Sequence, residues 1–169
     1  MGHIIDFKRY NNKRRGGEYM DILDVARTFL YMDSMSHKKL QKLCYYAQAW
    51  YVTIKNKPLF EDDIEAWVHG PVVPSLYSQY KTYGSRAIPR EVKIPNNVES
   101  NIEICEFLQN IYKVYGHLSA NELELLTHTE DPWINARQGK SEWQPGYDSI
   151  SLDDMKRYYS NLKWYINRG

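Results

Sequence analysis

Five histidines and two cysteines are the side chains of this sequence best suited to metal or nucleophilic chemistry. The histidines are His3, His37, His69, His117 and His128. None stands in an HxxxH, HExxH or CxxC spacing, whereas a zinc site needs three or four ligands around one ion. We therefore expect no metal site and no other cofactor.

Motifs for covalent catalysis and nucleotide binding are also missing. Cys44 falls on the apolar stripe of an expected helix, where a thiol is inert, and Cys105 falls in another apolar helical pattern. Ser75 lacks a GxSxG elbow, and neither a GxxxxGKS/T nor a GxGxxG loop occurs. We expect two reduced thiols in a cytosolic protein, with a disulfide between them as the alternative.

The acidic stretch 122–131 allows a catalytic and a structural interpretation. In the first, His128 is a general base that Glu130 or Asp131 orients. In the second, Glu122 completes a capping box, Asp131 caps the next helix, and His128 lies near a helix C-terminus, where a partly cationic imidazole is favourable. We favour the structural interpretation and expect that the chain is not an enzyme.

The charge of the chain is unevenly distributed. The 169 residues have a net charge of +1, but residues 1–19 contain five basic and two acidic residues, a net charge of +3. This segment has no apolar period and contains two adjacent glycines, so we expect a disordered basic tail before one domain at 20–169. The basic residues, which could bind the phosphates of nucleic acid, are Lys8, Arg9, Lys13, Arg14 and Arg15.

The composition is that of a globular domain rich in aromatic residues. No run of about 18 apolar residues is present and no secretory segment is recognisable, so we expect a cytoplasmic protein without a membrane span. Aromatic residues make up 14% of the chain, including fifteen tyrosines and five tryptophans. Not all of them can be buried with their polar atoms satisfied, and exposed Tyr and Trp favour protein–protein contact.

Apolar spacing and helix-end residues predict a mainly α fold, a compact bundle of six or seven helices with one or two short β-strands. Helices are expected over residues 21–32, 37–55, 74–83, 98–115 and 152–166, after the Ser119–Glu122 capping box, and from Asp131 to Gly139. A strand is expected at 63–69, broken by Gly70-Pro71, and a loop at 85–97.

The helix over 37–55 has the clearest pattern. Its apolar stripe comprises Leu40, Leu43, Cys44, Ala47, Tyr51 and Ile54. Lys38, Lys39 and Lys42 lie off this stripe and are expected on the solvent face, with a phosphate-facing patch as the alternative.

Several blocks of the sequence together resemble a known family. They are KLQKLCYYAQAW at 39–50, PLF at 58–60, IEAWVHGPVVPSLY at 64–77, VYGHLSANEL at 114–123 and THTEDPWINAR at 127–137. In this order they resemble the Panacea domain of SocA-like antitoxins, often described as phage-associated GepA-type proteins. Cys44 stands where the family pattern has an aliphatic residue, and the likeness covers about 20–159.

The resemblance implies a function that the residues alone do not. Members of the family are antitoxins, each of which neutralises a toxin encoded by a neighbouring gene, and many come from prophages. In at least one branch the antitoxin delivers its toxin to an ATP-dependent protease. The expected partners are therefore a cognate protein toxin and an ATP-dependent protease. The alternative is a DNA-binding regulator of a mobile-element operon, which would grip operator DNA through the basic tail. The family offers no catalytic residues to carry over.

The aromatic residues of these blocks have two possible roles. The candidates for contact with a protein partner are Trp50, Trp67, His69, Tyr77 and Tyr80. Alternatively, Trp67 and Pro71 only fix the corner between a strand and the next helix. A structural role is favoured for Leu40, Leu43, Ala47 and Gly70.

Overall fold

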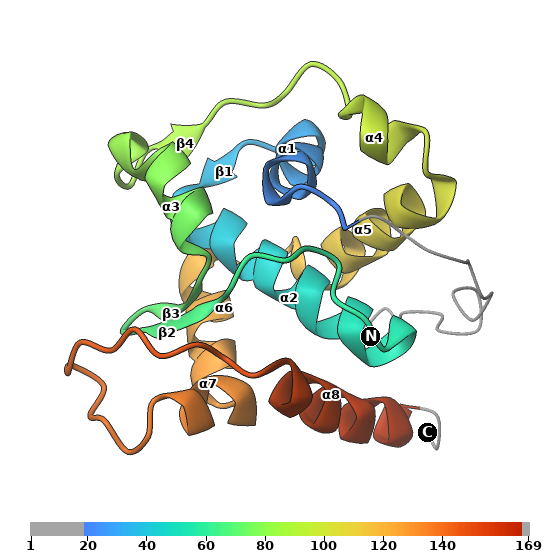
Figure 1. The fold of residues 1–169 in the computed structure, drawn as a ribbon. Helices are drawn as coiled ribbons and strands as arrows, with labels where there is room; N and C mark the ends of the chain where they lie inside the picture. Colours follow the sequence, from blue (N-terminus) through green and yellow to red (C-terminus); the bar gives the residue numbers. More distant parts are fainter. Residues whose placement is uncertain (1–18, 167–169) are drawn as a thin grey trace.

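Helix α2 (His37–Lys55) runs through the middle of the molecule (Figure 1). The computed structural model describes residues 19–166. On one side of α2 lie α1 (Ile22–Met32) and α5 (Ile102–Tyr115), and on the other side lies α8 (Leu152–Ile166). The core is therefore helix packed on helix, as the sequence predicts. The predicted basic tail lies, apart from Tyr19, outside the described residues.

Short elements complete the structure between these helices. They are β1 (Met35–Ser36), β2 (Glu65–Trp67), β3 (Gly70–Val72), α3 (Pro74–Tyr80), a 3-10 turn (Lys81–Tyr83), β4 (Ala87–Ile88), α4 (Asn96–Glu99), α6 (Ala120–His128) and α7 (Asp131–Ala136). The described residues thus form eight α-helices, six of them with at least seven residues. Among these helices, none combines the length and apolar character that crossing a membrane requires.

The described residues contain four short strands rather than the one or two expected. β1 pairs antiparallel with β4, with Met35 opposite Ile88. β2 and β3 form an antiparallel hairpin in which Trp67 lies opposite Gly70. Gly70-Pro71 was expected to end the strand, but it opens β3. β2 falls inside the strand expected at 63–69, whereas β1, β3 and β4 escape prediction because runs of two or three residues carry no periodic signal.

Most helices begin at the residue that local capping predicts. The side chains of Asp21 and Ser36 accept from backbone amides of α1 and α2, and the capping box of Ser119 and Glu122 is complete. The expectation that Asp131 is the N-cap of α7 is wrong, because Glu130 occupies that position. The expected 98–115 helix is also interrupted: α4 ends at Glu99, and α5 starts again after Asn101, whose side chain accepts from the Ile104 amide.

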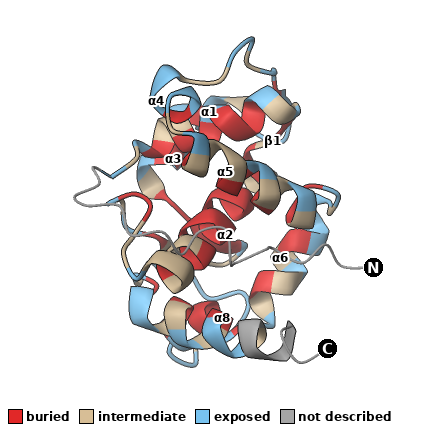
Figure 2. Ribbon diagram, turned by 90° about the vertical axis from the view of Figure 1, so that its right-hand side faces the viewer, coloured by how far each residue is buried: buried red, intermediate tan, exposed pale blue. Residues whose placement is uncertain are grey.

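α2 has no solvent face along its central part. Every residue from Leu40 to Trp50 is buried (Figure 2), because α1, α5, α6, α8 and the β2–β3 hairpin all pack against it. This overturns the expectation for Lys42, which is only 1% exposed. A sequence pattern shows which face of a helix is most apolar, but it cannot show that the opposite face is also covered.

The polar residues of α2 bind segments that are distant in the sequence. The amide of Gln41 accepts from Val73 N at 2.8 Å and donates to Val73 O at 3.2 Å. Gln48 likewise accepts from Leu59 N at 2.7 Å and donates to Phe60 O at 2.8 Å. Both glutamine side chains therefore replace the backbone partners that these turns lack, and they fix two loops on the central helix.

A cluster of aromatic residues joins α2 to α5 and α8. The Tyr46 ring stacks on Tyr115 at 3.9 Å between centroids, and the Tyr45 hydroxyl is 3.2 Å from that of Tyr159. The Tyr46 hydroxyl donates to the buried carboxyl of Glu130. Burial raises the pKa of Glu130 to about 7, although hydrogen bonds from Tyr46 and Tyr159 oppose this rise. Glu130 is thus a buried acid inside the aromatic cluster.

The two cysteines are free thiols within the described residues. Cys44 is fully buried, and burial raises the pKa of its thiol, as expected for an inert core residue. Cys105 is half-buried instead of lying in the core.

Glu130 makes the stability of the protein depend on pH. Its folded pKa of about 7 lies above the usual value of 4.5, so folding takes up a proton between these values. The stabilising contribution is therefore full below pH 4.5 and disappears as the pH rises through 7. In Glu130→Gln the free energy of unfolding, measured with urea, should lose this dependence, and its difference from wild type should change by up to about 3 kcal/mol between pH 5 and 8. Glu99→Gln, at an exposed position of α4, is the control for the charge change; equal pH profiles for wild type and Glu130→Gln would contradict the assignment.

Candidate partner-binding face

The structure separates the five predicted contact residues into two groups. Trp50 is 3% exposed and donates its indole N–H to the Tyr115 hydroxyl at 2.7 Å. Tyr80 is 7% exposed and lies edge-on to the His37 ring. Both side chains are core residues in this structure, because helices cover them, and they offer no surface to a partner. Partner contact stays a prediction for Trp67, His69 and Tyr77.

Trp67 is the centre of a group of rings at the β2–β3 hairpin. Its ring centroid lies 5.0 Å from that of Tyr77 in α3 and 5.7 Å from that of Tyr147, which it meets edge-to-face. Tyr77 is 40% and Tyr147 65% exposed. We call Trp67, Tyr77 and Tyr147 the hairpin face. The buried His37 ring stacks behind Tyr77 at 5.3 Å, so that the exposed ring rests on the core.

The orientation of Trp67 is fixed by polar contacts on both sides. Its indole N–H donates to the Glu65 carboxylate at 2.6 Å. Its backbone carbonyl accepts from the indole N–H of Trp133 at 2.9 Å, which ties β2 to α7. A ring already held in one orientation loses little conformational entropy when a partner binds.

Tyr147 was not singled out from the sequence. It lies in the polar segment between α7 and α8, where no apolar period marks it as part of a site. The available signal was the surplus of Tyr and Trp over what a core can hold, which indicates surface rings without saying where they lie.

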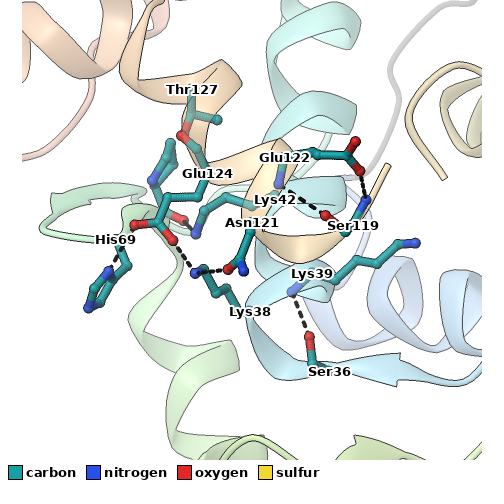
Figure 3. A network of polar contacts seen from close by, with 11 residues as sticks. Ser36, Lys38, Lys39, Lys42, His69, Ser119, Asn121, Glu122, Glu124 and Thr127 are labelled. Carbon is teal, nitrogen blue, oxygen red and sulfur yellow. Dashed lines mark hydrogen bonds and ion pairs between the residues drawn. The ribbon is translucent and has the colours of Figure 1, made fainter. Parts of the chain in front are cut away.

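A polar network holds the turn of the hairpin against α2 and α6 (Figure 3). His69 Nδ1 lies 2.9 Å from Glu124 Oε1, and Lys38 pairs with the same carboxylate. Lys38 also donates to the side chain of Asn121 at 2.9 Å. Burial disfavours the ionised form of Glu124, but hydrogen bonds from Lys38 and His69 outweigh it and lower the pKa. His69 thus sits at the tip of the hairpin, with its ring still largely exposed.

Lys42 lies beneath the hairpin. Its ammonium group donates to the Pro71 carbonyl at 3.1 Å. Burial lowers the pKa of Lys42 to about 7, while the neighbouring Glu124 raises it and Lys38 lowers it further. A lysine with such a pKa can serve as a nucleophile, but this one is enclosed on all sides and has no access to a substrate. Its geometry supports a structural role that holds β3 on α2.

Gly70 makes room for this lysine. A Cβ atom at position 70 would lie 2.5 Å from Lys42 Cε and 2.9 Å from Thr127 Oγ1. The backbone also has a φ of +103°, which residues with a side chain rarely adopt. Two independent constraints therefore require glycine at the turn, in agreement with the structural role expected from the sequence.

His128 and its acidic neighbours do not form a catalytic pair. The His128 ring stacks on Trp133 at 4.0 Å, and burial lowers its pKa below the usual value of 6.5. The expectation of a partly cationic imidazole is thus wrong, because the ring is desolvated. The Glu130 carboxyl binds Tyr46 instead of His128. Among the described residues, no three His, Cys, Asp or Glu side chains are grouped so that they could hold a metal ion.

These features describe a helical domain in which the half-buried Trp67 of the hairpin lies between the exposed rings of Tyr77 and Tyr147. Comparison with known proteins then gives the family: the model of "Antitoxin SocA-like, Panacea domain" matches residues 40–134. The chain belongs to this family of SocA-like antitoxins.

One curated relative is similar over more than half of the chain. Antitoxin SocA of Caulobacter vibrioides (strain NA1000 / CB15N) is 29% identical over 109 residues, which cover 59% of this chain and 58% of that protein. The chain thus matches less than two thirds of the length of this relative. No solved structure gives a significant match.

Replacing Gly70 tests the contact between the hairpin and Lys42. Gly70→Ala should lower the free energy of unfolding by about 2–4 kcal/mol, because overpacking adds to backbone strain. Gly84 is the matched control, since its φ is +56° but nothing lies within 4 Å of an added Cβ. Gly84 has a ψ of −126°, outside the left-handed helical region, so Gly84→Ala should show a backbone cost of about 1–3 kcal/mol without the overpacking, a smaller loss than that of Gly70→Ala. Urea unfolding that gives equal losses for both variants would show that Lys42 does not fill the space beside Gly70.

Proposed function

We propose that this protein is an antitoxin that binds and neutralises a protein toxin encoded by a neighbouring gene, and that the hairpin face is part of the contact surface. Family membership supports the first part. The second part rests on one observation, the clustering of the exposed Tyr77 and Tyr147 rings around the half-buried Trp67 of the hairpin. Tyrosine and tryptophan are the residues that most often dominate binding energy when partners bury them.

The proposed role is non-catalytic. The side chains considered for catalysis from the sequence are used in packing: Cys44 lies in the core, His128 stacks on Trp133, and Glu130 accepts from Tyr46. Neutralisation can proceed by blocking the toxin directly or by delivering it to an ATP-dependent protease. The two routes differ in the amount of toxin that remains in cells, so its level during coexpression separates them.

The DNA-binding alternative depends on residues outside the described part of the chain. It stays a prediction for Lys8, Arg9, Lys13, Arg14 and Arg15. If the tail binds operator DNA, affinity should fall steeply with salt, and replacing these five residues with glutamine should remove most of it. The measurement is a gel-shift titration on the promoter of the operon; affinity that is unchanged in the glutamine variant would contradict the alternative.

Coexpression with the neighbouring gene product tests the main proposal. The wild-type chain should restore growth and co-purify with the toxin. Tyr77→Ala should raise the Kd of the complex at least about tenfold, as is typical for a central aromatic contact. Tyr31→Ala is the matched control, because Tyr31 is 37% exposed in α1, away from the hairpin.

Two results would count against this proposal. A neighbouring product that is harmless alone and forms no complex would remove the antitoxin role. A complex that Tyr77→Ala and Tyr31→Ala weaken equally would leave the role intact but place the contact elsewhere.

A further inference from the structure

The segment between α7 and α8 adds further rings beside the hairpin. Tyr147 contacts Trp67, and Trp143, four residues earlier in the same segment, is 81% exposed. Figure 1 shows this segment passing alongside β2 and β3 before it enters α8. An exposed tryptophan leaves a large apolar surface in contact with water, and burying that surface in a complex would be favourable.

Arg137 holds this segment in place. Its side chain is buried, and one guanidinium nitrogen donates to the Ala66 carbonyl of β2 at 3.2 Å. The other donates to the carbonyls of Ser141, at 2.8 Å, and Gln144. The guanidinium carbon lies 5.3 Å from the centroid of the Trp133 ring. Arg137, the last residue of the 127–137 block, thus ties the segment to β2 and α7.

The same region carries a strong negative charge. The three segments that supply its rings, 61–69, 74–80 and 140–148, contain six carboxylates and one lysine. That lysine, Lys140, pairs with Asp148 at 2.9 Å. The Asp62 carboxylate accepts from the Ser75 hydroxyl at 2.6 Å. Ser75 lies in α3, two residues before Tyr77. Glu61 and Asp63 are exposed next to Asp62. The chain as a whole has a net charge of +1, so this concentration of carboxylates is local.

Resting on the proposed function, we infer that the hairpin face and the 140–148 segment bind an arginine- or lysine-bearing segment of the protein toxin. Cations are attracted to the faces of Trp and Tyr rings, and the carboxylates around these rings strengthen that attraction. Bases of single-stranded nucleic acid also stack on such rings, but the phosphates would be repelled by the excess of carboxylates. The combination of rings and carboxylates therefore favours a basic protein segment over nucleic acid.

The basic residues of the chain itself provide the main competing occupant. Met20, the second described residue, donates its backbone N–H to Leu59 O at 2.8 Å, two residues before Glu61. The five basic residues of 1–19 have the chemistry that the face selects. The test has to distinguish this occupant from a partner.

The test uses the full-length chain and a fluorescently labelled hexa-arginine peptide as the probe. Fluorescence anisotropy at about 50 mM salt should give saturable binding, and Asp63→Lys and Trp143→Ala should each raise the Kd about three- to tenfold. Glu99→Lys, an exposed charge reversal on α4, and Tyr31→Ala are the matched controls and should change it less than about twofold. A hexa-glutamate peptide and a twelve-nucleotide oligothymidine serve as the comparison probes.

Three outcomes would overturn the inference. The first is hexa-arginine binding that is absent or equal in all variants. The second is tighter binding of the oligothymidine with the same dependence on Trp143 and Asp63, which would make the face a nucleic-acid site. The third is binding that appears only when Lys8, Arg9, Lys13, Arg14 and Arg15 are replaced with glutamine, which would make the chain's own basic segment the occupant.

The complex with the toxin separates this inference from the proposed function. If the toxin binds wild type, Asp63→Lys and Trp143→Ala with equal affinity, the inference fails and the antitoxin role stands. If the peptide shows the expected pattern but no toxin is recovered, the basic-segment site stands and the antitoxin role fails.

Discussion

Between Leu40 and Trp50 every residue of helix α2 is buried, so the polar side chains along it need partners inside the protein. Gln41 binds the backbone of Val73, and Gln48 binds Leu59 and Phe60. Lys42 donates to Pro71, and Tyr46 donates to Glu130. These bonds reach three segments that are distant from α2 in the sequence, at 59–60, at 71–73 and at Glu130. The central helix therefore acts as the frame on which the hairpin, the two loops and α7 are placed.

This arrangement gives a physical reason for the sequence blocks that mark the family. The block at 39–50 supplies the glutamines, the lysine and the tyrosine, and the blocks at 58–60, 64–77 and 127–137 supply their partners. Loss of one partner would leave a buried donor or acceptor unsatisfied, which costs about 1–3 kcal/mol or more for a charged group. The blocks are thus linked by burial and hydrogen bonding, and much of the family pattern reflects the fold.

The exposed part of the same pattern differs in its energetics. Trp67 and Tyr77 are anchored by Glu65, Trp133 and His37, yet part of each ring faces solvent. Anchoring through the core means that a partner would meet rings already fixed in position, and such preorganisation lowers the entropy lost on binding. The polar network of Lys38, Glu124 and His69 adds a second support at the tip of the hairpin. The surface that we propose for partner binding is therefore rigid because of the residues beneath it.

The sequence by itself determined the helices, most of their ends and the inert character of Cys44. These depend on contacts within a few residues, such as the side chains of Asp21, Ser36 and Ser119 that cap the following helix. The family blocks also indicated which region to examine for partner contact. Only the tertiary structure decided that Trp50, Tyr80 and Lys42 are buried and that Tyr147 joins Trp67, since burial depends on helices and loops far away in the sequence. It likewise moved the cap of α7 to Glu130 and gave His128 a desolvated, stacked ring, because long-range packing on Tyr46 and Trp133 outweighs the local preference.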